Sequence, residues 1–319
     1  MGLLKYKQRS RLVATNLFMP ELKKIVFVGL GAMGFGMAAQ LLNKGFQVAA
    51  VDSRSEVKGR WTAAGGAWGE SPAAAAIDAD AIIVMVVNSE QVNSVLFGEK
   101  GALKNLRQGS VVIVTSTVSP SYSKDLGKQL SEAGYLYLDA PVSGGVVGAE
   151  SGSLSIMASG SEAAFETGEP LLKAMAAKIY RIGTEPGLGS IVKTVNQLLA
   201  GAHITLAAEA MAFGARAGVD PDVLYEVISH SAGSSWMFND RVPHMLAGDF
   251  TPRSAVNIFV KDLGIVLDIA RELKFPLPMA ALAHQVFLAA AAAGLGTEDD
   301  SAVVKVFQNL SGCSVARKK

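Results

Sequence analysis

Three residues in the second half of the chain have the types and the spacing that proton transfer needs. Lys193, Asn196 and Gln197 stand at positions i, i+3 and i+4, so a helix would place them on one face. A lysine whose pKa approaches neutrality can take up and return a proton, and two amides beside it can donate and accept hydrogen bonds. Taken alone, the spacing favours a solvated surface lysine, so the rest of the sequence must decide between the two interpretations.

The helix that would carry these residues is predicted over 190–217, with Gly218 as its C-terminal cap. Lys193 then lies at its N-terminal end, where the helix dipole disfavours a cation and lowers its pKa. Pro221 is predicted to open a further helix, and apolar residues recur at helical spacing from there to Leu310. The second half of the chain is therefore predicted to be all-α.

The first half of the chain instead alternates short apolar runs with helical segments. Several runs are almost wholly apolar, as expected of strands that are covered on both faces. Strands that alternate with helices form right-handed crossovers and a mostly parallel sheet. The predicted strands are 25–28, 47–51, 81–87, 111–115, 135–138, 154–158 and 179–182.

The first of these runs leads directly into the stretch GLGAMG, and a helix is predicted to follow from 34 to 44. In such a loop the first glycine permits a tight turn, the second lets the backbone approach a pyrophosphate, and the third lets the helix pack on the strand. The helix N-terminus then faces the phosphates. The predicted dinucleotide site includes Gly29, Leu30, Gly31, Ala32, Met33 and Gly34.

Asp52 follows the second apolar run, roughly 20 residues after the glycine loop, where Rossmann domains carry an acidic residue. A carboxylate at this position accepts hydrogen bonds from the adenosine ribose hydroxyls and repels a 2′-phosphate, which favours NAD over NADP. Arg54, two residues further on, could meet such a phosphate, so NADP stays the less favoured alternative.

Ligands of parallel sheets bind beyond the carboxyl ends of the strands. Val87 ends a predicted strand, Asn88 follows it, and Thr117 comes shortly after the next one, so all three are candidate cofactor contacts. Further along, DAPVSGGVVGAESGSL at 139–154 gathers small residues whose backbone NH groups suit a carboxylate. A flexible connector is the alternative for this segment, although the valines threaded through it argue against a floppy linker.

Taken together and in this order, GLGAMG, TSTVSP at 115–120, DAPVSGG and GSIVKTVNQLLAG at 189–201 resemble the β-hydroxyacid dehydrogenases. The resemblance extends from about Lys24 to Leu310. It implies that Lys193 is catalytic with Asn196 and Gln197 as its partners, and that Lys193 and Asn196 also bind substrate. It further implies that Ser143, Gly144 and Gly145 form a substrate-binding loop. Thr117 and Lys261 would lie beside the cofactor.

The resemblance implies NAD-dependent oxidation of a small hydroxy acid. Asn88, VLFG at 95–98 and TEDDSAVVK at 297–305 look most like the L-threonate dehydrogenase branch, which points to L-threonate or a related four-carbon sugar acid. The alternative is 3-hydroxyisobutyrate dehydrogenase or tartronate semialdehyde (2-hydroxy-3-oxopropionate) reductase. An imine reductase and a non-catalytic scaffold are more remote, because imine reductases usually lack the lysine and a scaffold does not need the intact glycine loop.

These observations predict an α/β Rossmann-type domain with a mostly parallel sheet at residues 23–186. The long helix joins it to an all-α domain for substrate binding and oligomerisation at residues 187–319, and residues 1–22 form an N-terminal extension. The first 18 residues are basic and contain no acid, so they resemble either an organelle transit peptide or an upstream extension before Met19.

Composition limits the partners and the setting. The formal net charge is +1 over 319 residues, which gives no electrostatic case for nucleic acid or a membrane surface. One cysteine, Cys313, and no metal-ligand pattern predict an intracellular, cytoplasmic protein without a metal. The plain apolar run 81–87 is too short to span a membrane. Apolar, alanine-rich helices predict a buried surface between subunits, and the family resemblance implies a homodimer or homotetramer.

Three further features have ordinary structural interpretations. Trp236 is expected to belong to the aromatic core. The acidic run at 298–300 is expected to be a solvated loop or a helix N-cap. Lys261 and Asp262 would form a surface ion pair if the lysine does not contact the cofactor.

Overall fold

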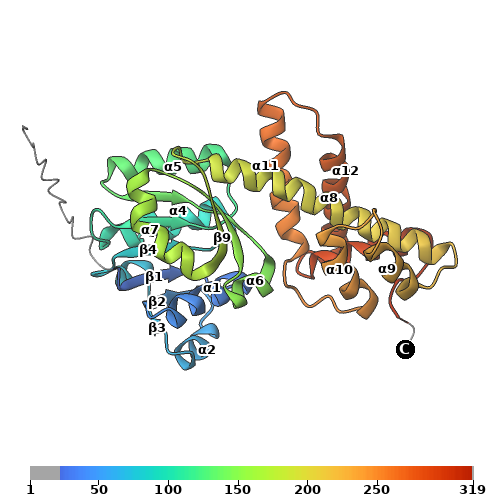
Figure 1. The fold of residues 1–319 in the computed structure, drawn as a ribbon, viewed down its shortest axis with the longest axis horizontal. Coiled ribbons are helices and arrows are strands. Elements are labelled where there is room, and N and C mark those ends of the chain that lie inside the picture. The colour runs from blue at the N-terminus through green and yellow to red at the C-terminus, as the bar shows by residue number, and fades with distance from the viewer. Residues whose placement is uncertain (1–21, 318–319) are drawn as a thin grey trace, which may run out of the picture.

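The computed structural model describes residues 22–317 and contains two domains that lie side by side (Figure 1). The 29-residue helix α8 (Leu188–Arg216) runs from the first domain into the second. The first domain is an α/β unit around a largely parallel sheet and the second is helical. The fold class predicted from the sequence is therefore confirmed. Most of the predicted N-terminal extension lies outside the described residues.

The sheet has nine strands within the described part of the chain, in the order β3-β2-β1-β4-β5-β6-β8-β7, with β9 beside β8. Neighbours from β3 to β6 are parallel, whereas β8 runs antiparallel to β6 and β7. The strands are β1 (Lys24–Val28), β2 (Gln47–Val51), β3 (Ala67–Trp68), β4 (Ala81–Val84), β5 (Val111–Val114), β6 (Leu136–Asp139), β7 (Val142–Ser143), β8 (Leu154–Ser159) and β9 (Ala176–Gly183).

Two strands of this sheet were not predicted. Strands β3 and β7 have two residues each, too few to show a period. The antiparallel pairing of β7 with β8 depends on a chain reversal between them. Gly144, Gly145 and Gly152 make that reversal with positive φ angles of 130°, 62° and 67°, a region that glycine enters readily.

Helices cover both faces of the sheet and divide its side chains between two hydrophobic cores. Ile25 and Phe27 point to one core, which α1 and α7 cover. Val26 and Val28 point to the other, which α4 and α5 cover. Alternate residues of one strand are buried on opposite faces, which explains the continuous apolar runs. The helices are α1 (Ala32–Asn43), α2 (Val57–Ala63), α3 (Pro72–Ala75), α4 (Ser89–Phe97), α5 (Pro120–Glu132), α6 (Gly145–Ser151) and α7 (Glu162–Met175), with a 3-10 turn at Ala102–Lys104.

The helical domain packs around the C-terminal part of α8. Its core includes Ile204 and Met211 of α8, and Phe259 stacks on Phe287 with ring centroids 5.0 Å apart. The other elements are α9 (Pro221–Ser229), α10 (Trp236–Ala247), α11 (Val256–Glu272), α12 (Pro278–Ala290), the π-helical turn η2 (Ala291–Leu295), the 3-10 helix η3 (Asp300–Val303) and α13 (Val304–Ser311).

Within residues 22–317, two helices are long and apolar enough to cross a membrane by length and composition alone, which the sequence did not lead us to expect. They are α8 and the segment Pro278–Leu295. The expectation was based on unbroken apolar runs, whereas the mean hydropathy of a helix can be high even when polar residues are scattered along it. In α8, 56% of the most apolar window is buried inside the protein, as in a core helix, and in Pro278–Leu295 the share is 22%.

Candidate active site

The glycine loop leaves open space where a pyrophosphate would approach. A Cβ atom at Gly29 would lie 2.1 Å from the carbonyl oxygen of Met85, and one at Gly34 would lie 1.8 Å from the carbonyl oxygen of Gly29. At Gly31 an added Cβ would meet nothing within 4 Å. Gly31 is also the N-cap of α1 and provides no side-chain hydrogen bond, so the first amides of α1 can bind an anion. The loop therefore fits a dinucleotide.

This loop lies at the point where the strand order changes direction. Strand β1 has β2 on one side and β4 on the other, and such switch points hold the ligand in open α/β sheets. Strand β4 ends at Val84, three residues before the predicted end, so Val87 belongs to the connection with α4. Asn88 is the N-cap of α4 and accepts from Gln91 N at 2.9 Å, while the Gln91 side chain accepts from Val87 N at 2.8 Å. This reciprocal cap fixes the loop.

Asp52 directly follows β2 and is bound on both carboxylate oxygens. Its Oδ2 accepts from Leu30 N at 2.6 Å, and its Oδ1 accepts from Arg54 Nε at 3.0 Å. Burial raises the pKa of Asp52, but hydrogen bonds from Arg54 and Leu30 outweigh it and lower that pKa below its ordinary value. The Arg54 side chain is 49% exposed. Arg54 thus covers the carboxylate to which ribose hydroxyls would bind.

The segment around Ser143 is an ordered turn and not a flexible connector. Ser143 pairs with Ser155 in the antiparallel β7–β8 contact. The chain then turns through Gly144 and Gly145 into α6, and a Cβ atom at Gly145 would meet nothing within 4 Å. The turn therefore offers a hydroxyl group and backbone amides beside open space.

Lys193, Asn196 and Gln197 do not form a solvated helix face. Lys193 and Gln197 are each 7% exposed. Asn196 Nδ2 donates to Gln197 Oε1 at 2.9 Å, and Gln197 Nε2 donates to Asp262 Oδ2 at 2.5 Å. By contrast, Lys193 Nζ has no hydrogen-bond or ion-pair partner among the described residues. The amides are anchored and the amine is available to a ligand.

Burial lowers the pKa of Lys193 to about 8. The negative charge of Asp262 opposes this effect and raises the pKa, whereas the positive charge of Lys261 lowers it further. A lowered pKa was predicted from the helix dipole, and in the structure burial is its largest cause. Near neutral pH, part of the population therefore carries a neutral amine that can accept a proton.

Lys261 and Asp262 of α11 contact the Rossmann domain and helix α8, respectively. Lys261 Nζ donates to the carbonyl oxygen of Thr117 in the Rossmann domain at 2.9 Å. It also lies 2.7 Å from Asp262 Oδ1. That contact is an ion pair without hydrogen-bond alignment, because Oδ1 has no hydrogen-bond partner. Lys261 thus lies between the domains, beside the threonine that was predicted to contact the cofactor.

Asp262 is a candidate site residue that the sequence analysis missed. It is 2% exposed, which excludes the surface ion pair considered above. The sequence contained a signal that Asp262 is buried. Phe259, Leu263 and Val266 form the buried stripe of α11, and Asp262 falls on the same side of that helix. A carboxylate in an apolar stripe needs a polar partner, and Gln197 and Lys261 provide it.

One other expectation was wrong and another was only partly right. Trp236 is 60% exposed at the start of α10 and does not belong to the core. Asp299 and Asp300 are fully buried, so the acidic run is not a solvated loop, although Asp299 does cap the 3-10 helix that follows. Among residues 22–317, no group of three or more His, Cys, Asp or Glu side chains is arranged to hold a metal ion.

Comparisons with known proteins agree with this geometry. The family model of the NAD binding domain of 6-phosphogluconate dehydrogenase matches residues 24–183, and that of the NAD-binding domain of NADP-dependent 3-hydroxyisobutyrate dehydrogenase matches residues 187–307. The L-threonate dehydrogenase of Cupriavidus necator is 54% identical over 90% of this chain and 97% of its own. That of Escherichia coli K12 is 49% identical over 89% and 94%.

A solved structure supports the same relationship. The crystal structure described as 3-hydroxyisobutyrate dehydrogenase from Salmonella typhimurium superposes with a TM-score of 0.85 at 47% identity, and the match covers 88% of this chain and 99% of that one. The chain therefore belongs to the β-hydroxyacid dehydrogenase family, most like its L-threonate dehydrogenases, and is an NAD(P)-dependent dehydrogenase of hydroxy acids.

Proposed function

We propose that this dehydrogenase oxidises L-threonate or a closely related four-carbon sugar acid, with NAD preferred to NADP. The relatives from Cupriavidus necator and Escherichia coli, both named L-threonate dehydrogenase, support the substrate class. The observation that carries the chemistry is the buried, unpartnered amine of Lys193 beside two anchored amides. Asp52 at the end of β2 supports the preference for NAD.

Lys193 acts as the general acid and base. With a pKa of about 8, its neutral form takes the proton of the substrate hydroxyl, and its ammonium form returns that proton in the reverse reaction. Asn196 and Gln197 orient the hydroxyl group. The bond from Gln197 to Asp262 holds the amide pair in place, so its remaining polar atoms can bind substrate without reorganisation.

Ser143 and the backbone NH groups of Gly144 and Gly145 bind the substrate carboxylate. The glycine loop Gly29–Gly34 and Asp52 hold the cofactor on the Rossmann side, with Val87, Asn88 and Thr117 along the nicotinamide half and Lys261 facing from α11. When bound, NAD⁺ supplies the hydride acceptor. With the cofactor bound between them, the Rossmann side and the helical side of the site together exclude water from the proton transfer.

3-Hydroxyisobutyrate dehydrogenase or tartronate semialdehyde reductase activity is the second candidate. The Salmonella typhimurium structure described as 3-hydroxyisobutyrate dehydrogenase supports the first of these. Both substrates are shorter than threonate but present a carboxylate and a neighbouring hydroxyl or carbonyl group. The same Lys193 and Ser143 groups would therefore serve either reaction, and the substrate decides between them.

The test is the initial rate of NADH formation with a panel of hydroxy acids, each with NAD⁺ and with NADP⁺. The panel contains L-threonate, D-threonate, D-erythronate, 3-hydroxyisobutyrate and glycerate. We expect the highest kcat/KM with L-threonate and NAD⁺. A higher kcat/KM with 3-hydroxyisobutyrate would select the second candidate. No turnover with any acid, while NAD⁺ still binds, would contradict both.

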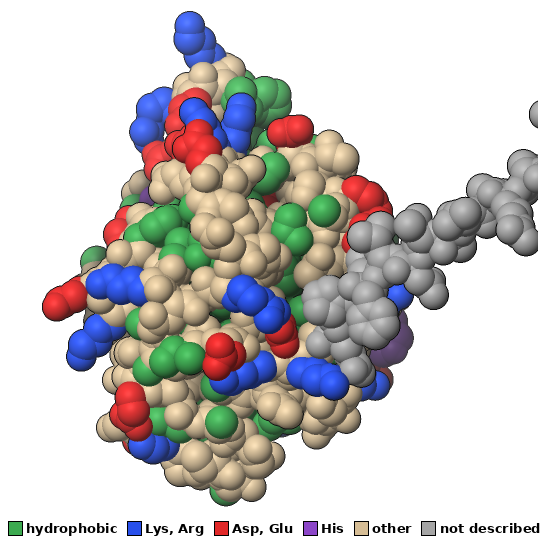
Figure 2. All heavy atoms as spheres, turned by 90° about the vertical axis from the view of Figure 1, so that its left-hand side faces the viewer, with side chains coloured by type: hydrophobic (Ala, Val, Ile, Leu, Met, Phe, Trp, Pro, Cys, Tyr) green, Lys and Arg blue, Asp and Glu red, His purple; other side chains and the backbone are tan. Residues whose placement is uncertain are grey.

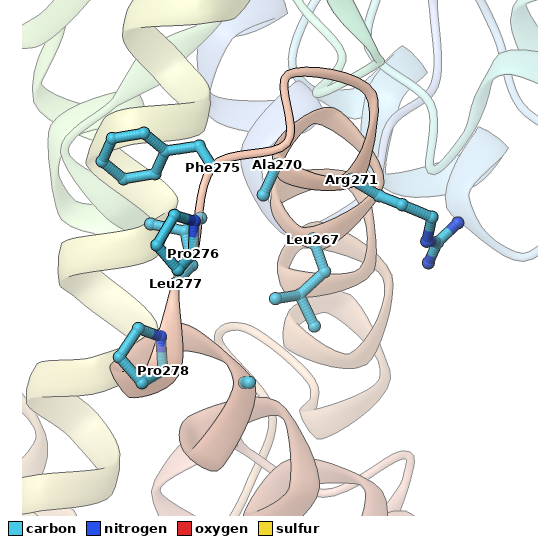
Figure 3. A pocket seen from close by; sticks show the side chains of 8 residues that line it. Leu267, Ala270, Arg271, Phe275, Pro276, Leu277 and Pro278 are labelled. Carbon is cyan, nitrogen blue, oxygen red and sulfur yellow. The ribbon is translucent and has the colours of Figure 1, made fainter.

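We also propose that the chain self-associates through its helical domain. Large apolar side chains are exposed along one side of α8, where Val195, Leu206 and Phe213 are 55%, 48% and 76% exposed. A groove of about 570 Å³ lies between the end of α11 and the start of α12 (Figure 3). Burial of such surface drives association.

The oligomer is tested by light scattering on the wild type and on Phe213→Glu. We expect a mass of two or four times 33.2 kDa for the wild type and a smaller particle for the variant. A monomeric wild type would contradict self-association. The outer face of the Rossmann domain differs from this helical surface, since Figure 2 shows acidic and basic side chains interspersed over it.

A further inference from the structure

Asp139, the last residue of β6, is a buried carboxylate that the proposed chemistry does not use. Its side chain is fully buried. Oδ2 accepts from Gly187 N at 3.0 Å, from Ser190 N at 2.9 Å and from Ser159 Oγ at 3.3 Å, while Oδ1 accepts from Ser190 Oγ at 2.7 Å. Among the described residues no cation pairs with it. Both oxygens are thus satisfied by backbone amides and hydroxyl groups alone.

Three of these four hydrogen bonds come from the start of α8. The N-cap residue Gly187 offers no side-chain cap of its own, so the first amides of this 29-residue helix depend on partners from elsewhere in the chain. Ser159 Oγ adds a bond from Gly189 N at 3.0 Å. A carboxylate at a helix N-terminus also interacts favourably with the helix dipole. The Rossmann sheet therefore caps α8 through Asp139.

The start of α8 has little room to move once this cap is in place. A Cβ atom at Gly189 would lie 2.3 Å from the carbonyl oxygen of Met157 and 2.9 Å from that of Asp139. The helix backbone therefore packs directly on the ends of β6 and β8. Burial raises the pKa of Asp139 while hydrogen bonds from Ser190 lower it.

Asp139 is also close to two parts of the proposed site, one along the backbone and one through its side chain. Along the backbone, only three residues separate it from Ser143, where the proposed carboxylate-binding turn begins. Through its side chain it holds Ser190, one helical turn before Lys193. One residue therefore links the group that would bind the substrate carboxylate to the helix that would bring the proton acceptor.

We infer that Asp139 is a positioning residue: its carboxylate fixes the first turn of α8 to the end of β6 and so sets where Lys193 stands relative to the Ser143 turn. This inference rests on the proposed function of Lys193. Misplacement of a reacting group by about 1 Å can cost roughly 10²-fold in rate, so the cap affects turnover more than cofactor binding, which uses the distant glycine loop.

The test compares Asp139→Ala with Asp139→Asn. Titration calorimetry gives the Kd for NAD⁺ and the number of binding sites per chain, and initial rates are then expressed per NAD⁺ site, so that unfolded protein does not count. For Asp139→Ala we expect kcat to fall by about 10², with the Kd for NAD⁺ within about threefold of the wild type. For Asp139→Asn we expect kcat to recover to within about tenfold of the wild type. Its amide oxygen can replace Oδ2, and the Ser190 hydroxyl can accept from its NH₂ group.

Asp300→Ala is the matched control, because Asp300 is an equally buried carboxylate bound to Arg241, which has no role in the proposed site. We expect it to lower the melting temperature and to leave kcat per NAD⁺ site unchanged. If Asp139→Ala does not fold, Ser190→Ala replaces it. This variant removes one bond to a charged group, and we expect about a tenfold loss in kcat at an unchanged Kd for NAD⁺.

Wild-type kcat per NAD⁺ site in Asp139→Ala, or in Ser190→Ala where that replaces it, would overturn the inference. A rate in Asp139→Asn as low as that in Asp139→Ala would also overturn it, since hydrogen-bond geometry would then not set the rate. The proposed function is tested separately by Lys193→Ala. An active Asp139→Ala beside an inactive Lys193→Ala removes only the Asp139 inference, whereas a wild type without turnover removes both.

Discussion

Two buried polar clusters in the helical domain differ in how completely their charges are partnered. The cleft cluster consists of Lys193, Asn196, Gln197, Lys261 and Asp262. The η3 cluster consists of Arg241, His244, Asp299, Asp300 and Ser301. Both contain buried carboxylates and cations, so burial alone does not separate a structural cluster from a catalytic one.

In the η3 cluster every charged group is paired. Arg241 Nε donates to Asp300 Oδ1 at 2.5 Å and its Nη2 donates to Asp300 Oδ2 at 3.1 Å, while Asp240 takes a further guanidinium bond. Asp299 accepts from Arg253 N at 3.0 Å and from Ser301 Oγ at 2.6 Å. Such complete pairing is what a buried ionic network needs to be tolerated.

In the cleft cluster, two polar atoms lack hydrogen-bond partners, although one of them, Asp262 Oδ1, lies in an ion pair with Lys261. Lys193 Nζ has neither a hydrogen bond nor an ion pair among the described residues. Asp262 Oδ1 is the buried side-chain atom of the described chain that has no hydrogen-bond partner. Unsatisfied buried groups cost stability, and proteins keep them where a ligand completes the set. Incomplete partnering, more than burial, therefore distinguishes the proposed active site from the η3 cluster.

Removing the unpartnered amine should have the largest effect. We expect Lys193→Ala to lower kcat by about 10³, because proton transfer by a positioned side chain typically contributes 10² to 10⁴. The Kd for NAD⁺ and the melting temperature should stay close to the wild type, since the amine has no protein partner to lose. Steady-state rates and NAD⁺ titration measure this, and near-normal turnover would remove Lys193 from its role.

Breaking the paired cluster should produce the opposite pattern. We expect Arg241→Met to lower the free energy of unfolding by about 3 kcal/mol, because it leaves Asp300 buried without its cation. The folded fraction should keep the wild-type kcat. Urea unfolding measures the stability and rates per NAD⁺ site measure the activity. A catalytic defect without loss of stability would break the distinction between the clusters.

The charge of Asp262 should act on the pH dependence of the rate. In the proposed mechanism oxidation needs neutral Lys193, so kcat/KM should rise as the pH passes through the pKa of this lysine, about 8. Asp262 raises that pKa, so in Asp262→Asn the pKa falls and the rise should move to lower pH. We also expect about a tenfold loss in kcat, because Gln197 loses a charged hydrogen-bond partner. A pH–rate profile with an unmoved or alkaline-shifted limb would contradict this role.

Asp52 and Arg54 are an exception to the difference between the two clusters, because they are fully partnered with each other yet lie in the proposed cofactor site. The Arg54 side chain is half exposed, and ion pairs with an exposed member contribute at most about 1 kcal/mol to stability. We expect Arg54→Ala to lower the KM for NAD⁺ by no more than about fivefold, since ribose hydroxyls no longer compete with the guanidinium. A rise in KM would instead make Arg54 a cofactor ligand.

Much of the fold could be predicted because local sequence patterns govern it. Strand β2 has the predicted bounds 47–51 and α9 begins at Pro221 as predicted. Helix α8 begins two residues before the predicted start, and Gly218 follows its end with a positive φ of 93°. Apolar period, capping residues and glycines act within a few residues of chain, so the sequence contains the whole signal.

Parts of the site could not be predicted in this way, because their partners are distant along the chain. Gln197 and Asp262 are 65 residues apart, and Asp139 and Ser190 are 51 apart. Trp236 remains 60% exposed although aromatic residues are often buried, while the next two residues of α10, Met237 and Phe238, face the core. Contacts of this kind depend on which elements pack together, and periodicity within one element does not encode that.

Residue type and local spacing are enough to predict the two-domain class, the glycine loop, the acidic end of β2 and the helix face that carries Lys193. They do not reveal that Lys193 is buried without a partner, that Asp262 anchors Gln197, or that Asp139 caps α8. Desolvation and hydrogen bonding between elements depend on three-dimensional proximity, and they are what turn a helix face into a site for chemistry.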